Sequence, residues 1–169
     1  MTRFWLPGLV LLLVAAPRAD ARTPKDPVAA SSPAPSFTLP ARTGTVVCSD
    51  SLRGKVVLVD FWASWCGPCQ KSFPWLSAMY DRYSAKGLTI VAINLDKDRV
   101  AAEAFLAKHP APFTVAFDPS GKTAKAYKVW GMPSSFILSP TGTVLYSYAG
   151  FNPDHAGAVE AMIKEACPQ

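Results

Sequence analysis

Apolar runs and amphipathic stretches alternate from residue 37 onward and predict most of the secondary structure. The runs at residues 56–61 and 88–95 are almost continuously apolar, which is typical of strands buried on both faces of a sheet. Between them, apolar side chains recur at helical spacing, which indicates an amphipathic helix that ends near Gly87. Pro74 lies inside this helix and is expected to kink it. The pattern thus begins as strand, helix, strand.

A second helix and a set of shorter apolar runs follow. Asp98 has the position of a helix N-cap, and the helix after it is expected to end before Pro110. Thr141 and Gly142 form a turn that joins the last two runs into an antiparallel hairpin. The other predicted elements are short strands at residues 37–39, 45–47, 113–117, 135–138 and 144–149 and a helix from about residue 153. This order predicts an α/β fold with a central mixed β-sheet flanked by helices and an added N-terminal hairpin.

Residues 1–21 have the pattern of a secretory signal peptide. Arg3 gives a basic start, residues 4–16 are an apolar stretch, and an Ala-x-Ala signal predicts cleavage after Ala21. The alternative is an uncleaved membrane anchor. It is disfavoured because 13 apolar residues interrupted by Pro7 are short of the roughly 20 that span a bilayer.

The segment after the leader is rich in Pro, Ala and Ser and has no apolar periodicity. Such a composition is typical of a flexible linker, which we place at residues 22–36. The folded domain is then expected at residues 37–169, a length typical of one domain with a single core. A formal net charge of +5 comes from scattered basic residues without a concentrated patch, so no nucleic-acid partner is expected.

The chemistry of the chain is concentrated in Cys66, Gly67, Pro68 and Cys69, at the junction of the first buried strand and its helix. Gly67 lets the chain turn, and Pro68 suits a first helical turn, where its missing N–H is no loss. A helix N-terminus stabilises a thiolate, so the pKa of Cys66 is expected to fall from about 8.5 towards roughly 7. Cys66 is therefore the predicted nucleophile, and Cys69 is the shielded thiol that resolves a mixed disulfide.

Several stretches together resemble the thioredoxin superfamily: residues 59–69, Pro74 and residues 131–136. The lead-in at residues 37–39 and 52–55 is similar to the exported TlpA/ResA-like branch of thiol-disulfide oxidoreductases. The resemblance covers most of the predicted domain. It implies a thioredoxin-like fold, protein-disulfide oxidoreductase activity, and no bound cofactor or metal.

The resemblance also assigns roles to individual residues. Pro133 matches the family's cis-proline, and Met132 before it would face the disulfide and offer backbone hydrogen bonds to a substrate strand. Trp65 matches the aromatic residue beside the nucleophile, where simple packing is the alternative role. The substrate-binding residues expected on this basis are Trp65, Gly67, Pro68 and Met132.

Asp60 matches the buried acid that helps to move the proton of the second cysteine in thioredoxins. Burial raises the pKa of a carboxyl group, so Asp60 can act as a base near neutral pH. A structural role, such as pairing with Lys55, is the alternative. One departure concerns the branch: its members often have glutamate three residues after the second cysteine, where this chain has Ser72, and asparagine where Asp60 stands. That departure leaves the range of client proteins open.

Cys48 and Cys167 complete an even count of four cysteines. A structural disulfide between them is the first interpretation, because closing so long a loop could stabilise the fold by about 4 to 5 kcal/mol. The alternatives are two free thiols or a second redox relay to the Cys66 and Cys69 pair.

The predicted function is that of a periplasmic, monomeric oxidoreductase that reduces disulfides in client proteins. The Gly-Pro dipeptide between the cysteines is that of thioredoxin, whose potential near −270 mV makes it a reductant. In an oxidising compartment the protein would need a membrane thiol reductase as electron donor. The resemblance suggests clients from cytochrome c or copper-site assembly.

Two other functions remain as alternatives. Cys66 and Cys69 could handle Cu(I) or Zn(II), with His109 and His155 as the only histidines to assist them. A peroxiredoxin-like peroxidase is also considered, although the Thr-x-x-Cys arrangement of that family is missing. Covalent haem attachment is excluded because Gln70, not histidine, follows Cys69.

Overall fold

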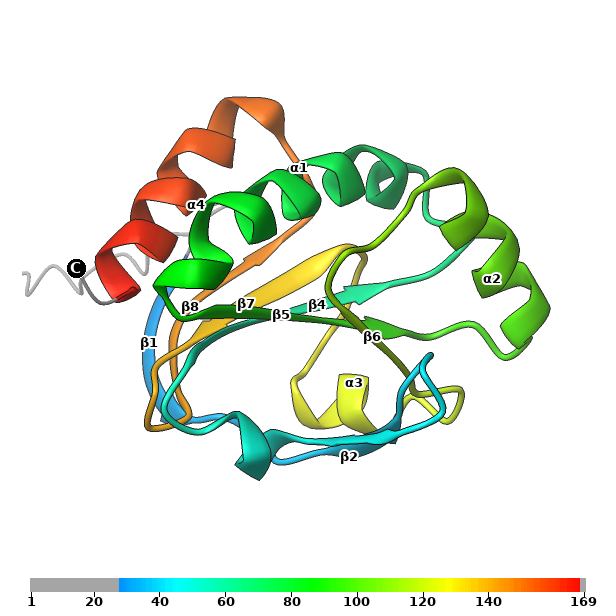
Figure 1. Cartoon of the computed structure of the whole chain (residues 1–169), viewed down its shortest axis with the longest axis horizontal. Helices are drawn as coiled ribbons and strands as arrows, with labels where there is room; N and C mark the ends of the chain where they lie inside the picture. Colours follow the sequence, from blue (N-terminus) through cyan, green and yellow to red (C-terminus); the bar gives the residue numbers. More distant parts are fainter. Residues whose placement is uncertain (1–27, 168–169) are drawn as a thin grey trace, which may run out of the picture.

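The computed structural model describes residues 28–167, which form a central six-stranded sheet and a separate hairpin (Figure 1). The strands are β1 (Val28–Pro33), β2 (Thr38–Pro40), β3 (Val46–Cys48), β4 (Val56–Trp62), β5 (Leu88–Asn94), β6 (Thr114–Phe117), β7 (Ser134–Leu138) and β8 (Thr143–Ala149). The order in the central sheet is β1-β8-β7-β4-β5-β6. β4, β5 and β6 run parallel, whereas β7, β8 and β1 are antiparallel to their neighbours. β2 and β3 form the predicted N-terminal hairpin.

Helices and the hairpin cover the two faces of the sheet. The helices in the described chain are α1 (Gly67–Tyr83), α2 (Arg99–Lys108), α3 (Lys122–Ala126) and α4 (Pro153–Ala166). α1 and α4, joined by an ion pair between Arg82 and Glu160, lie on one face, and α3 and the hairpin lie on the other (Figure 1). Buried residues of α2 belong to the same core as those of α1. The fold class predicted from the apolar pattern is confirmed.

β4 is buried along its whole length, as its apolar run predicts. Alternate side chains of a strand point to opposite faces of the sheet. Leu58 and Trp62 belong to the core under α1 and α4, whereas Val59 and Phe61 belong to the core on the α3 side. Asp60 stands between Leu58 and Trp62 in this alternation, so its side chain lies on the α1 face.

The β2–β3 hairpin protects the edge of the sheet next to β6. Ala41 forms an antiparallel bridge with Ala116, and the Arg42 amide donates to the Val115 carbonyl at 2.8 Å. The Arg42 side chain also pairs with Glu103 of α2 at 2.8 Å. These contacts cover an edge that would otherwise offer unpaired backbone groups.

The prediction of a flexible linker at residues 22–36 is wrong for its second half. Val28–Pro33 forms β1, which pairs with β8, and the Ala34 amide donates to the Gly142 carbonyl at 2.9 Å. An edge strand pairs through its backbone groups, so a segment rich in Pro, Ala and Ser can take this place without apolar periodicity. Residues 1–27, with the predicted leader and its cleavage site, lie outside the described residues.

The predicted ends of the helices agree with the structure. α1 continues through Pro74, and after a short 3-10 turn the chain leaves at Gly87 with a φ of 91°. The Asp98 side chain caps α2 by accepting from the Val100 amide. α3, at five residues, was not predicted because so short a helix shows no periodicity. None of the helices within residues 28–167 is both long and apolar enough to cross a membrane.

Candidate active site

A disulfide between Cys66 and Cys69 stands at the start of α1. The two sulfur atoms are 2.05 Å apart, and the two Cα atoms are 5.3 Å apart. Cys66 is the N-cap of the helix, and its Sγ accepts a hydrogen bond from the Cys69 amide at 3.2 Å. Pro68 occupies the first helical turn, as predicted. The first turn of the helix therefore directs the Cys69 amide at the sulfur of Cys66.

The two cysteines differ in access. Cys69 is completely buried, whereas Cys66, although only 4% exposed, lines an open, mainly apolar hollow. The walls of this hollow include Trp65, Gly67, Pro68, Trp130 and Met132. A partner that enters the hollow meets the sulfur of Cys66 first. The arrangement agrees with the expected division into an attacking and a shielded thiol.

Two tryptophans are exposed beside the disulfide. Trp65 is 72% exposed and Trp130 is 71% exposed, which is unusual for the largest aromatic side chain. Trp65 was singled out from the sequence, whereas Trp130 was not. Its position two residues before Met132, in the loop that lines the hollow, was the available signal. The pair gives the hollow an apolar rim suited to protein contacts.

The loop before β7 places Met132, which precedes the predicted proline, in the hollow that Cys66 also lines. The peptide bond between Met132 and Pro133 is cis, as the resemblance implied. The loop is held on both sides: the Ser134 hydroxyl donates to the Gly131 carbonyl at 2.7 Å, and the Gly150 amide donates to the Pro133 carbonyl at 2.7 Å. Met132 therefore lines the hollow from a fixed backbone.

Asp60 is buried on the face of the sheet that α1 covers, with 1% of its surface exposed. Burial raises the pKa of Asp60 to about 7, although a hydrogen bond from Ser135 acts in the opposite direction. The Ser135 hydroxyl donates to Oδ1, and Oδ2 has no partner. Within the described chain Asp60 makes no ion pair, so the alternative of a pair with Lys55 is not what the structure shows. The group can exchange a proton near neutral pH.

Ser72 stands where related proteins often have glutamate, and it is also buried. Its hydroxyl donates to the Cys69 carbonyl one turn earlier in α1, at 3.1 Å. The hydroxyl is thus used within the helix. Asp60 is a buried acid, whereas Ser72 contributes no carboxyl group.

The predicted disulfide between Cys48 and Cys167 is wrong, because both are free thiols. Cys48 ends β3 in the hairpin on the α3 side, whereas Cys167 follows α4 and belongs to the core on the opposite face (Figure 1). The central sheet separates them. The Thr38 hydroxyl donates to Cys48 and lowers its pKa, whereas burial raises the pKa of Cys167.

Metal ligands do not gather around the disulfide. The side chain of His155 lies outside the described residues, and among the side chains that are described no group of three His, Cys, Asp or Glu is placed to hold a metal ion. His109 ends α2 and packs its ring on Phe105, with 4.5 Å between the ring centroids. The described part of the chain therefore offers Cys66 and Cys69 no third ligand of these types.

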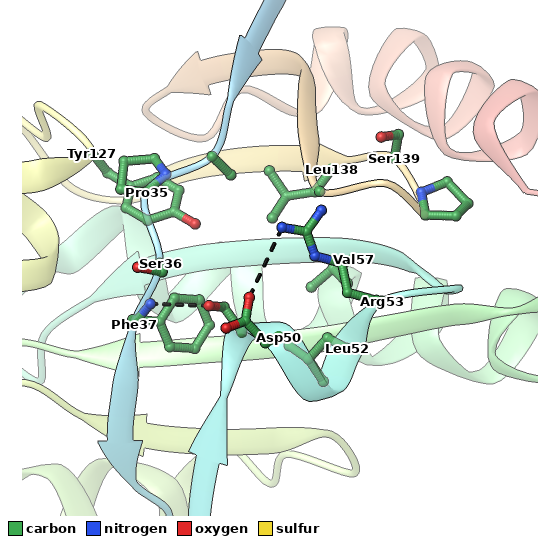
Figure 2. A pocket seen from close by; sticks show the side chains of 14 residues that line it. Pro35, Ser36, Phe37, Asp50, Leu52, Arg53, Val57, Tyr127, Leu138 and Ser139 are labelled. Atoms are coloured by element: carbon green, nitrogen blue, oxygen red, sulfur yellow. Dashed lines mark hydrogen bonds and ion pairs between the residues drawn. The ribbon is translucent and has the colours of Figure 1, made fainter.

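A second pocket lies on the opposite face of the sheet, between the β2–β3 hairpin and the end of β7 (Figure 2). Arg53 reaches into it beside Asp50, with 3.9 Å between Nη2 and Oδ1. The buried hydroxyl of Tyr127 borders it without a hydrogen-bond partner, and burial raises the pKa of Tyr127 to about 12. None of the predicted site residues lines this pocket.

Comparison with known proteins places this geometry in a family. A family model described as Redoxin matches residues 29–163. The thiol-disulfide oxidoreductase ResA of Bacillus subtilis is 32% identical over 126 residues, which are 75% of this chain and 70% of that protein. A crystal structure of a protein described as the thiol:disulfide interchange protein DsbE from Chlorobium tepidum is 50% identical. It has a TM-score of 0.79 and covers 81% of this chain and 96% of its own.

A solution structure from Neisseria meningitidis, described as a thioredoxin, is 27% identical with a TM-score of 0.70 over 80% of this chain and 90% of that one. The fold, the cysteine pair and these relatives agree. The chain belongs to the Redoxin family and is a TlpA/ResA-like thiol-disulfide oxidoreductase of the thioredoxin superfamily.

Proposed function

We propose that this oxidoreductase is exported and reduces disulfides in partner proteins outside the cytoplasm. One observation carries the proposal: Cys66 lines an open hollow at a helix N-terminus, and Cys69, bonded to it from the first turn of the helix, is completely buried. A thiolate at Cys66 can meet an incoming disulfide there, while Cys69 is kept from solvent. The Gly-Pro pair between them is that of the reducing thioredoxins.

The reduced protein acts in two exchanges. The thiolate of Cys66 attacks one sulfur of the client disulfide, forming the Cys66–client bond and releasing the other client sulfur as a thiolate. Cys69 then attacks Cys66, giving its proton to Asp60, and the second client sulfur leaves with the electron pair. The client has gained two electrons, and Cys66 and Cys69 are oxidised. A membrane thiol reductase must return the electrons.

The hollow supplies the docking surface. An extended client strand would pair with the backbone before Pro133, where Met132 lines the wall. Trp65, Gly67 and Pro68 would contact the strand on the other side of the disulfide. Clients awaiting cytochrome c or copper-site assembly fit the chemistry, since both need reduced cysteine pairs. The protein acts as a monomer, after removal of residues 1–21.

Trapping in the native host tests this function. A Cys69→Ser protein should accumulate mixed disulfides through Cys66, because the resolving thiol is missing. A Cys66→Ser protein is the matched control and should trap none and reduce no insulin. Identification of the captured proteins would reveal the clients and the electron donor. Full insulin reduction by the Cys66→Ser protein would overturn the mechanism, and capture of cytoplasmic proteins alone would overturn the location.

A further inference from the structure

Asp60 is one member of a polar row that crosses three neighbouring strands. It lies opposite Ser135 of β7, and Ser135 lies opposite Tyr148 of β8. We propose that Ser135 and Tyr148 are positioning residues that hold Oδ1 of Asp60 and leave Oδ2 as the atom that accepts the proton of Cys69. The inference rests on the proposed role of Asp60 and adds the residues through which the chain controls it.

The donors and acceptors of Tyr148, Ser135 and Asp60 fix the direction of each hydrogen bond in the row. A serine hydroxyl has one proton to donate and two lone pairs that accept. Ser135 donates its proton to Oδ1 of Asp60. Tyr148 is the cross-strand neighbour of Ser135, and because the Ser135 proton is used at Asp60, a bond between the two hydroxyls needs Tyr148 to be the donor. Burial, and secondly the charge of Asp60, raise the pKa of Tyr148, so this hydroxyl keeps its proton at neutral pH.

The other residues packed around Asp60 offer its carboxyl group no polar partner that could replace Ser135. On β5 the opposite residue is Ala92, which has no polar group. The α4 residues in the same core include the apolar Val159 and Ile163. Tyr148 of β8 is a titratable group coupled to Asp60, and Cys66 and Cys69 belong to the core on the same face of the sheet. No basic side chain pairs with the carboxylate within the described chain.

This arrangement gives the two carboxyl oxygens different tasks. Oδ1 is occupied by Ser135, whereas Oδ2 is buried and without a partner. In the second exchange the proton of Cys69 moves to Oδ2 as the bond between Cys66 and Cys69 forms, and the client sulfur leaves as a thiolate. The hydrogen bond at Oδ1 stabilises the charged form and so makes Asp60 ready to accept at a lower pH than burial alone would allow.

The direct test is to measure the pKa of Asp60 by carboxyl ¹³C NMR. The oxidised protein is used, because Cys66 and Cys69 do not titrate while they are bonded. Ser135→Ala removes the bond that stabilises the carboxylate, so the pKa of Asp60 should rise by about one unit. Ser135→Thr keeps a hydroxyl and should restore the native value. Ser134→Ala is the matched control, since this buried neighbour bonds the Gly131 carbonyl and should leave the pKa unchanged.

Tyr148→Phe tests the outer member of the row. The pKa of Asp60 should rise by less than in Ser135→Ala, because Ser135 still donates but loses the group that orients it. Tyr146→Phe is the control, because Tyr146 lies opposite Ile137 and bonds Glu165 at 3.5 Å. The pH profile of the release of a Cys66-linked client should shift upward with the NMR value in each variant.

An unchanged pKa of Asp60 in Ser135→Ala, with a folded protein, would overturn the proposal. The role of Asp60 in proton transfer is tested separately with Asp60→Asn. A normal rate of client release in that variant would overturn the proton transfer, whereas the NMR shift in Ser135→Ala does not depend on it. A Tyr148→Phe protein with the native pKa would remove Tyr148 from the row.

Discussion

Asp60 on β4 stands directly opposite Ala92 on β5, so the buried carboxyl group has no cation beside it on the parallel side of the sheet. Its one hydrogen-bond partner comes from the antiparallel side, at Ser135. A buried carboxylate with a single donor is costly in its charged form, which is why its pKa lies at about 7 rather than near 3.8. The fold gives up some stability at neutral pH to keep this acid at the site.

Asp60→Asn should therefore stabilise the oxidised protein at pH 8. The folded-state pKa lies above the unfolded value, so the folded protein binds more protons between about pH 4 and 7 and loses stability as the pH rises through that window. The amide removes this loss. The free energy of unfolding at pH 8 should increase by about 2 to 4 kcal/mol, and the gain should disappear by about pH 4.

Denaturant unfolding at the two pH values measures the effect. Asp81→Asn is a suitable control, because Asp81 lies on α1 but is exposed, and it should change the stability little at either pH. A gain in Asp60→Asn of equal size at pH 4 and pH 8 would contradict a cost that arises from the charge.

The two active cysteines should react at different rates once reduced. Cys66 lines the hollow, and the start of α1 stabilises its thiolate, whereas Cys69 is completely buried. Brief exposure to iodoacetamide at pH 7 should label Cys66 at least about tenfold faster than Cys69. Peptide mass spectrometry measures the ratio, with the denatured protein as reference. Equal rates in the native protein would show that the burial of Cys69 does not shield it.

Cys48 and Cys167 should remain thiols in the oxidised protein. The sheet lies between them, so no small movement can join them. Alkylation of the unreduced protein in denaturant should add two labels, and reduction beforehand should add four. In the native protein Cys48 should react first, because it is partly exposed and Thr38 lowers its pKa, whereas Cys167 is buried. If the unreduced protein took up no label, Cys48 and Cys167 would have to be joined in a disulfide after all.

The elements that the sequence predicts are those in which local chemistry and tertiary structure agree. β4 and β5 are buried on both faces and therefore read as continuous apolar runs. The start of α1 at Gly67 was predictable because Pro68 and the N-cap at Cys66 are local features. The resemblance to thioredoxins added the cis bond before Pro133, which no local pattern indicates.

The residues that sequence reasoning missed depend on strand register. Ser135 became a partner of Asp60 only because β7 pairs with β4 in one particular register, and Tyr148 follows from the pairing of β8 with β7. A shift of one residue would turn Ser135 to the other face. The placing of Cys48 and Cys167 is equally non-local. Their even count suggested a bond, whereas the topology puts them on opposite faces.

Trp130 should contribute to client docking without taking part in the exchange. It is 71% exposed, so its removal costs the fold little, yet it lines the hollow together with Cys66. Aromatic side chains in such positions carry much of the binding energy of an interface. Trp130→Ala should lower kcat/KM for reduction of a protein disulfide about fivefold, mainly through KM.

Val100→Ala provides the matched control, because Val100 is 74% exposed but lies on α2, and it does not line the hollow. That variant should keep native kinetics. A small disulfide, which needs no wide docking surface, should be reduced by the Trp130→Ala protein at close to the native rate, since Cys66 and the helix start are unchanged. An equal loss with both substrates would mean that Trp130 acts on the reactivity of Cys66, and unchanged kinetics with both would remove it from the docking surface.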